Sequence, residues 1–487
     1  MTAIRILTVV TLIVAAGAAV ASRQTPETTP MARDRETMTA ADQGDLAVTV
    51  YNSSLALVRD IREFTLPAGE SDLHFVDIAA TVNPATVHLR SLTEPSRLSV
   101  LEQNYEFDLL EPEKLLRKYV GRDVTLVRTR MQNGSATQEE VTARLVSYNN
   151  GPIWKIGNDY VTGLGSDHIR FPELPSNLYS RPTLVWRLAN RGGARHRVET
   201  SYLAGGLSWQ ADYVLTVGRD DKAADLDGWV TLTNGSGTTF RDAKLQFVAG
   251  DLNRVAPARQ KGAMEAMADM RAAAAPAMVQ EAFSEYHLYT LGRRTTIANQ
   301  QTKQLSLLNG TGVPVEKRYV VDGQSFYYRN RRSPGAPLKD QVQVFYRFKN
   351  DDKSGLGAPM PQGVIRVYQA DSKGGLQFVG EDRIDHTPKD EAIDLKIGNA
   401  FDVVCERNQT DFEKISDSVY EMEFAITLRN HKAVPIAVQV NEPVGGTWRM
   451  VRSTHEWQKT AAWAAQFTVP VPADSSATLK YRVRVTY

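Results

Sequence analysis

Cysteine is almost absent from this chain of 487 residues, whose single cysteine is Cys405. No intrachain disulfide can form, so each domain must be held together by its own hydrophobic core, which a chain of this length can build. Cys405 ends the strand-like run of residues 401–405. We therefore expect it to be a small buried hydrophobe and not a nucleophile.

An excess of charge of either sign is also missing. The chain has 57 Lys and Arg residues against 56 Asp and Glu residues, a formal net charge of +1. This balance removes the electrostatic argument for nucleic acid or an anionic membrane surface as a partner.

Motifs that hold cofactors or carry out nucleophilic catalysis are missing as well. The sequence has no G-x-x-x-x-G-K, no G-x-G-x-x-G between a strand and a helix, and no G-x-S-x-G. The histidines form no H-x-H or H-x-x-x-H pair: they are His74, His88, His168, His196, His287, His386, His431 and His455. We predict no cofactor, no zinc site and no catalytic residue that can be named.

Only one apolar run approaches the length of a membrane span, and it lies at the amino terminus. Arg5 precedes the uncharged residues 6–20, and Ala19 and Ala21 form an A-x-A pattern before Ser22. The pattern predicts a signal peptide over residues 1–21, because the run is shorter than the ~20 apolar residues of a spanning helix. An uncleaved anchor is the alternative. We expect an exported protein, periplasmic in a bacterium, with a flexible linker over residues 22–45 and no integral membrane helix after cleavage.

Alternation with a period of two dominates the rest of the chain. Residues 342–348, 420–428, 434–440 and 479–487 place apolar and polar side chains in turn, as strands with one buried face do. Asn-Gly pairs at Asn133, Asn150, Asn234 and Asn309 favour tight hairpins. The sequence predicts a mainly β protein of antiparallel sandwich or barrel domains.

Two segments depart from this pattern. Residues 110–120 predict a short helix, with Pro112 near its start and Gly121 just beyond its end. Residues 256–282 are rich in Ala and Met and predict a helical or disordered excursion from a sheet. A Met-rich docking helix for an apolar partner is a second interpretation of that segment.

The length of the chain predicts several domains. We place an N-terminal β domain at residues 46–185, a first sandwich at residues 186–350 and a C-terminal sandwich at residues 351–487. Strands that end at Asn190, Asn234 and Asn430 share a short local pattern, each followed by a polar turn and another strand. This echo suggests shared architecture without establishing duplication.

The densest polar cluster spans residues 380–391. A histidine beside carboxylates, as at Asp385, His386 and Asp390, could ligate a metal or serve as an acid–base pair. A polar strand-to-turn connection explains the same residues, and we favour it. If the chain has a chemical site, this patch is the first candidate.

Several separated motifs resemble a bacterial family, the domain-of-unknown-function family 4139. They are residues 202–213, 245–255, 380–391, 398–403 and 430–432, and the resemblance extends over residues 187–487. It implies a β-rich, often exported protein, and some members are called mucoidy-inhibitor-A-like, which suggests a link to the cell envelope. This chain lacks the coiled-coil insertion of those members, and the resemblance implies no catalytic residue.

Three functions remain open. The first is a non-enzymatic envelope protein that binds another protein or a surface polymer. The second is a periplasmic hydrolase or metal-dependent enzyme near Asp385 and His386, with a sugar platform formed by Tyr105, Trp154, Trp186, Trp209 and Trp229. Such aromatics more often fill sandwich cores. The third is an outer-membrane barrel, which the charge and proline on both faces of many strands disfavour.

Overall fold

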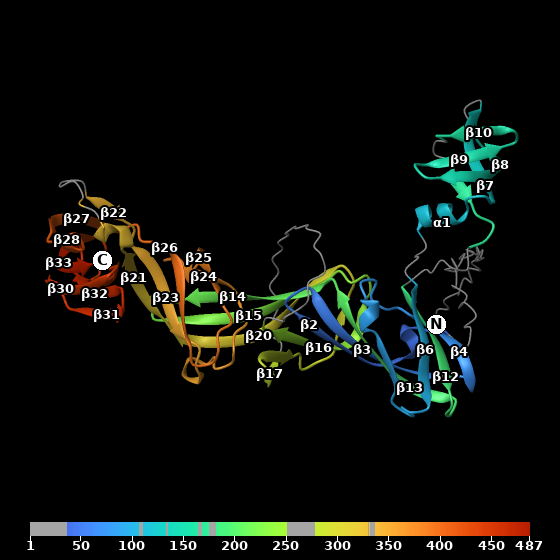
Figure 1. Ribbon diagram of the computed structural model, residues 1–487, viewed down its shortest axis with the longest axis horizontal. Helices are drawn as coiled ribbons and strands as arrows, with labels where there is room; N and C mark the ends of the chain where they lie inside the picture. Colours follow the sequence, from blue (N-terminus) through green and yellow to red (C-terminus); the bar gives the residue numbers. More distant parts are fainter. Residues whose placement is uncertain are drawn as a thin grey trace, which may run out of the picture.

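The computed structural model describes residues 37–106, 111–132, 135–163, 168–174, 182–250, 278–329, 331 and 337–487. The predicted signal peptide, residues 22–36 of the linker and residues 256–277 of the excursion lie outside these ranges. The described chain is mainly β, with six sheets and a single α-helix, which confirms the predicted sandwich class (Figure 1). No helix in these ranges has the length and apolarity needed to cross a bilayer.

The N-terminal sandwich contains a four-stranded sheet of β1 (Thr37–Met38), β4 (Gly69–Val76), β12 (Thr183–Asn190) and β6 (Leu98–Glu106). It faces one part of a larger sheet, formed by β17 (Val279–Phe283), β18 (Tyr286–Thr290), β16 (Phe240–Ala249), β2 (Gln43–Tyr51), β3 (Leu55–Thr65), β13 (Arg195–Gly205) and β5 (His88–Ser91), with β19 (Thr295–Ile297) paired to β16. The short helices η1 (Ala40–Asp42) and η2 (Pro84–Thr86) belong to this region.

The strands of this sandwich do not follow the segment boundaries that we predicted from the sequence. Residues 37–45 of the expected linker contribute β1, η1 and the start of β2, with Thr39 capping η1. The boundary placed between residues 185 and 186 falls within β12, which pairs with β4 and β6. Residues 279–282 of the expected excursion lie in the edge strand β17.

A small domain is inserted between β6 and β12. It comprises α1 (Pro112–Lys118) and a sheet of β10 (Asp159–Thr162), β9 (Pro152–Ile156), β8 (Ser135–Tyr148), β7 (Asp123–Gln132) and β11 (His168–Arg170). The helix expected over residues 110–120 is therefore confirmed. Tyr119, Leu145 and Trp154 lie in a separate small core.

The middle sandwich packs the other part of the large sheet against β20 (Gln301–Pro314), β15 (Ala223–Asn234), β14 (Leu207–Val217), β24 (Gly363–Ala370) and β25 (Leu376–Ile384). Trp209 of β14 contacts Phe247 of β16 across the interior, with ring centroids 5.3 Å apart. One continuous hydrophobic core serves the N-terminal and middle sandwiches.

The C-terminal sandwich has a six-stranded sheet of β26 (Ala392–Asn399), β23 (Gln343–Lys349), β21 (Glu316–Asp322), β29 (Ile436–Pro443), β32 (Ala464–Val471) and β31 (Trp457–Ala461). It faces a five-stranded sheet of β22 (Leu338–Asp340), β27 (Val403–Lys414), β28 (Val419–Asn430), β33 (Ser475–Thr486) and β30 (Thr447–Ser453). The short helices η3 (Ser325–Tyr328) and η4 (Asp352–Ser354) lie in its connections.

The six-stranded sheet is shared between two sandwiches. Tyr346 and Phe348 of β23 join the core of the middle sandwich, whereas Tyr319 and Val321 of β21 join the separate C-terminal core. The sandwiches therefore follow one another along an elongated molecule (Figure 1). The seam between the last two is the place where this shared sheet passes from one core to the other.

Buried asparagines stabilise four corners where the chain passes from one sheet to a facing one. Asn430 ends β28, and its Nδ2 donates to the carbonyls of Val434, Val471 and Pro472, while its Oδ1 accepts from the backbone N–H of Lys432. Val471 and Pro472 precede β33, the strand that pairs with β28. The amide therefore ties two neighbouring crossovers to each other at the point where both strands change sheets.

The other three joints repeat this geometry. Asn190 and Asn234 donate to the carbonyls of residues 66–67 and 297–298, and Asn350 donates to Ala358 and Pro388. In each corner the residue two positions after the second carbonyl has a positive φ: they are Gly69, Gln300, Asp390 and Asp474. The echo read from the sequence thus marks three of four equivalent corners, and Asn350 is the fourth.

Candidate functional site

The polar patch predicted from the sequence lies in the crossover from β25 to β26. The backbone N–H of Asp390, at φ +69°, donates to the carbonyl of Asn350 as part of that corner. The Nδ1 of His386 accepts from the backbone N–H of Gln362 at 3.2 Å, and Asp385 is exposed. In the described ranges no three His, Cys, Asp or Glu side chains are grouped to hold a metal. The patch has a structural role, and any chemical role for it stays a prediction.

The predicted sugar platform is wrong for three of its five aromatics. Trp154, Trp186 and Trp209 are buried in the hydrophobic cores, where they cannot stack on a polymer. Trp229 and Tyr105 are half-buried, and the Tyr105 hydroxyl donates to the carbonyl of Ala80. Burial of large strand aromatics outweighs their ability to form a platform.

Two groups with catalytic chemistry are sealed inside the molecule. Ser91 Oγ lies 3.0 Å from His196 Nδ1, and His196 Nε2 lies 3.1 Å from Asn190 Oδ1, but all three side chains are buried. Both ring nitrogens of His196 have a hydrogen-bond partner inside the fold, so the cluster supports the corner at Asn190. Burial raises the pKa of the Cys405 thiol to about 12, as expected for a structural cysteine.

The best-formed pocket with convergent polar groups lies at the seam between the middle and C-terminal sandwiches. We call it the seam pocket, and its volume is about 170 Å³. Its lining residues are Lys317, Tyr319, Val344, Val379, Ile397, Gly398, Asn399, Ala400, Phe401, Asp402 and Lys432. A cavity of ~150 Å³ can hold a benzene-sized group, so this pocket suits one aromatic or aliphatic side chain.

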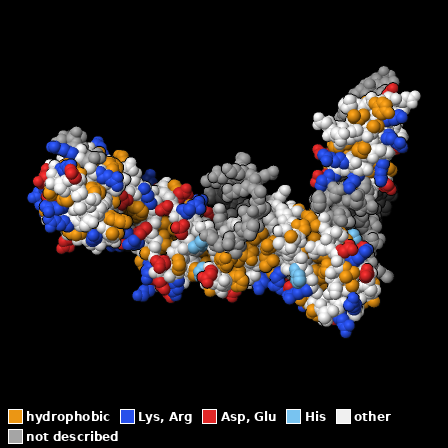
Figure 2. Space-filling model, viewed as in Figure 1, with side chains coloured by type: hydrophobic (Ala, Val, Ile, Leu, Met, Phe, Trp, Pro, Cys, Tyr) orange, Lys and Arg blue, Asp and Glu red, His pale blue; other side chains and the backbone are white. Residues whose placement is uncertain are grey.

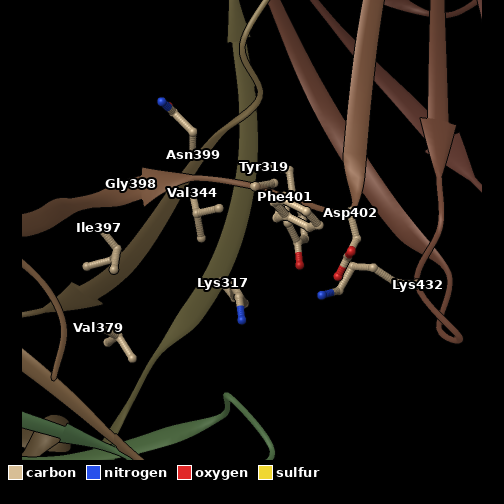
Figure 3. Close-up of a pocket in the computed structure, with 11 residues that line it drawn as sticks. Lys317, Tyr319, Val344, Val379, Ile397, Gly398, Asn399, Phe401, Asp402 and Lys432 are labelled. Carbon is tan, nitrogen blue, oxygen red and sulfur yellow. The ribbon is translucent and has the colours of Figure 1, made fainter. Parts of the chain in front are cut away.

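Apolar and charged side chains lie on different sides of the seam pocket. In Figure 3, Val379, Ile397 and Val344 lie on one side of the view, and Asp402 and Lys432 lie on the other. Phe401 stands at the rim with 95% of its surface exposed. Exposing a whole aromatic ring forgoes the roughly 1.5–3 kcal/mol that burial of such a side chain contributes. Folding alone does not account for a phenylalanine at this position.

The wall beside Lys317 is fixed by a half-buried carboxylate. Asp221 Oδ2 lies 3.0 Å from the Lys317 ammonium, and Asp221 Oδ1 accepts from the Tyr346 hydroxyl and, at 2.8 Å, from Gln369. Burial raises the pKa of Asp221, but these donors together outweigh burial and hold that pKa below its usual value. The positive charge of Lys317 is therefore balanced by the carboxylate of Asp221. Lys432, by contrast, forms no ion pair within the described part of the chain.

An open sheet edge borders this pocket. Strand β25 pairs with β24 alone among the described strands, and its residues 376–379 are exposed on both faces apart from the contact of Phe378 with Tyr368. Phe378 is 55% exposed, and Leu376 and Val379 are exposed as well. A β-bulge at Val379 interrupts the pairing of β25 with β24, and at Gly380 β25 lies so close to β26 that an added Cβ would come within 2.4 Å of the Ile397 carbonyl oxygen. The exposed half of β25 therefore leads directly to Val379 in the pocket wall.

A second pocket, of about 460 Å³, lies in the inserted domain between α1 and β11. Its lining is mostly apolar, from Leu115 and Leu116 of α1 to Phe171 and Leu174. Few polar groups converge there to orient a ligand, so the seam pocket is the better candidate.

The surface around these features carries both signs of charge. Figure 2 shows basic and acidic side chains interspersed along the molecule, in agreement with the net charge of +1.

Comparison with models of known protein families finds no match, and no curated protein matches the chain either. The resemblance to the domain-of-unknown-function family 4139 stays a prediction.

Proposed function

We propose that this chain is an exported, non-enzymatic β-sheet protein of the bacterial envelope that binds another protein at the seam. In this proposal an extended segment of the partner pairs with the open edge of β25 and inserts one apolar side chain into the seam pocket. The observation that carries the proposal is the fully exposed ring of Phe401 beside an apolar, unpaired strand edge.

The unpaired edge of β25 favours a partner that adds a strand to the sheet. Soluble proteins usually protect their sheet edges with charge, proline or a covering loop, because unpaired N–H and C=O groups recruit other strands. Residues 376–379 carry Leu376, Phe378 and Val379 instead. Strand addition uses the main chain for affinity and a neighbouring pocket for specificity. The seam pocket has the size and position for that second role.

Charge refines the expected partner. Among the residues that the structure describes, Lys432 has no ion-pair partner, while Lys317 is held by Asp221. A partner segment with an aromatic or aliphatic side chain next to a carboxylate would satisfy both the apolar wall and Lys432.

Export itself rests on the sequence of residues 1–21. Cell fractionation, with sequencing of the mature amino terminus, is expected to find a periplasmic chain that starts at Ser22.

Site-specific photo-crosslinking in the cells that produce the protein tests the proposal. A photoreactive residue is placed at Phe401 or Phe378 and, as a control, at Tyr160, whose exposure lies between those two but which belongs to the inserted domain. The expected result is one adduct protein common to positions 401 and 378 and absent from position 160.

The adduct protein is then purified and its affinity for the chain is measured. We expect the Phe401→Ala and Val379→Lys variants to weaken binding at least tenfold while the Tyr160→Ala variant does not. A partner that binds all three variants equally, or adducts that form equally at position 160, would overturn the proposal. Unchanged circular dichroism of the variants excludes misfolding as the cause.

A further inference from the structure

The outer face of the six-stranded sheet carries a row of polar side chains, five amides and one carboxylate, that crosses every strand. The row consists of Asn399 on β26, Gln343 on β23, Asp322 on β21, Asn441 on β29, Gln466 on β32 and Gln458 on β31. The strand register sets four of the five neighbouring pairs in this row directly opposite each other, and Gln343–Asp322 is the exception. We call this row the amide ladder.

Hydrogen bonds connect most of the amide ladder into one chain. Gln343 and Asn441 donate to the two oxygens of Asp322 at 2.9 and 2.8 Å. Gln466 donates to Asn441 at 3.0 Å, and Gln458 donates to Gln466 at 2.7 Å. Long amide side chains normally lose rotamer entropy when a ligand orders them. Here their mutual bonds have already fixed them, so a ligand would meet a preorganised surface.

The ladder retains unused hydrogen-bonding capacity toward solvent. Each amide has two N–H donors and an oxygen with two lone pairs, and the ladder uses only part of them. Each of its six side chains is exposed or half-buried. With strands about 4.8 Å apart, the six-strand row extends over roughly 24 Å of sheet. It is therefore a long, flat array of donors and acceptors and not a pocket for a small molecule.

The chemistry of this array points to one class of ligand. Asp322 is its single ionisable side chain, and that carboxylate already accepts two amide bonds. A hydroxyl offers one donor and two acceptor sites, the complement of an amide. The row ends at the hairpin of β31 and β32, whose turn carries the largely exposed Trp463, a surface for an apolar sugar face. We infer that the amide ladder binds a neutral polysaccharide laid across the strands.

Affinity electrophoresis and titration calorimetry of the mature full chain test this inference. The probes are dextran, pullulan, mixed-linkage β-glucan and galactomannan as neutral polymers, with alginate as the anionic one. We expect at least one neutral polymer to bind, and the Asn441→Ala, Gln466→Ala double variant to bind it at least tenfold more weakly. Binding should change less than twofold between 50 mM and 1 M NaCl, because no ion pair forms.

A matched control is the Asn408→Ala, Thr478→Ala double variant, which alters polar residues on the outer face of the five-stranded sheet. It should bind as the unaltered chain does. Binding of no neutral polymer, binding of alginate alone, or equal loss in both double variants would overturn the inference.

A second copy of the chain is the competing occupant, because stacked Asn and Gln ladders can also pair with each other. Sedimentation velocity distinguishes this case: a dimer that the Asn441→Ala, Gln466→Ala variant dissociates would overturn the polysaccharide site. Protein docking at β25 is unaffected by the ladder variants, so the two proposals fail independently.

Discussion

The C-terminal sandwich presents two different surfaces to solvent. The outer face of its six-stranded sheet carries the amide ladder, in which four amides and the Asp322 carboxylate bond to one another, beside a smaller ion cluster of Arg318, Arg347 and Asp394. The outer face of its five-stranded sheet carries an ion ladder, which we define as Asp411, Glu413, Glu421, Glu423, Arg452, Arg482 and Arg484. Both faces are regular β-sheet with alternating side chains, so the backbone does not account for the difference.

The contrast lies in how each face satisfies its polar groups. Arg482 lies 2.5 Å from Asp411 and 2.9 Å from Glu421, and Arg484 lies 2.5 Å from Glu421. The ion ladder thus saturates its charges internally, and its strength depends on pH and salt. The amide ladder keeps free donors and acceptors, and Asp322 is its one charged member. A sheet face that binds a neutral polymer is better built from amides than from ion pairs.

Alkylation of Cys405 can report the stability of the C-terminal sandwich, on which the comparison of the two faces can be tested. It is the single cysteine of the chain and lies buried in the C-terminal core between the two faces. With a thiol pKa of about 12, raised by burial, it should react with an alkylating agent only when this sandwich unfolds. The alkylation rate in increasing urea therefore measures the stability of the C-terminal sandwich alone.

The largest effect is expected from a buried ion cluster between the faces. Arg407 is 1% exposed, and its Nε and Nη2 lie 2.7 Å from Asp340 and from the fully buried Glu442. Arg407→Met leaves Glu442 without its cation, which should cost about 3–5 kcal/mol of unfolding free energy. Arg429→Met, which removes a partly exposed pair with Glu406, should cost less than about 1 kcal/mol. Similar losses in both variants would show that burial does not govern these pairs.

A smaller loss is expected at the corner that joins the two sheets. Asn430→Ala removes the donor for the carbonyls of Val434, Val471 and Pro472, and should cost about 1–3 kcal/mol, measured by Cys405 alkylation. Asn190→Ala makes the equivalent change in the N-terminal sandwich. It should leave the alkylation profile unchanged, and a shift there would mean that the sandwiches unfold as one unit.

The two ladders themselves should differ in their response to single substitutions. Arg482→Gln removes the shared partner of Asp411 and the buried Glu421 and should cost about 1–2 kcal/mol, between the exposed and buried cases. Gln458→Ala removes one exposed amide at the end of its ladder and should change the stability by less than about 0.5 kcal/mol. The same urea series compares both variants. Equal effects in the two variants would show that the two faces do not differ in how much one side chain contributes to stability.

The smallest predicted effect is the acid sensitivity of the ion ladder. The hydrogen bond from Arg482 lowers the pKa of Asp411; burial raises the pKa of Glu421, but its bonds to Arg482 and Arg484 outweigh burial and lower it overall. A carboxyl whose pKa is lowered by folding stabilises the protein above its ordinary value of about 4, and this contribution is lost as the pH falls through the lowered value. Stability followed by circular dichroism should therefore fall between about pH 5 and pH 3, and by less in Arg482→Gln. An identical decrease in that variant would contradict the assignment.

Much of the fold could be predicted from local pattern. Alternation over residues 420–428 and 479–487 corresponds to β28 and β33, and the segment containing Pro112 corresponds to α1. Asn-Gly pairs were less reliable: Asn150 lies in the β8–β9 hairpin, whereas Asn309 lies within β20. The pair favours a local φ, but pairing with a neighbouring strand can override it.

The candidate sites depended on long-range register that no local pattern encodes. The seam pocket combines residues of β21, β23, β25 and β26 with the loops that carry Phe401 and Lys432. The amide ladder takes one side chain from each of six strands. The alternation that identified the strands gave the face of each side chain but not its neighbours. The pattern at Asn350 escaped notice because the echo was defined by a short polar turn followed at once by another strand. After β23, which ends at Lys349, the next strand begins only at Gly363.

Hydrogen exchange of the β25 amides tests the central claim most directly. Exchange is measured on the mature chain alone and after mixing with the partner protein captured through Phe401. The account predicts slowed exchange over residues 376–379, because strand addition pairs their free backbone groups, and no change in β31, an edge strand of the six-stranded sheet. Protection confined to β31, or no protection of β25 under saturating partner, would contradict it.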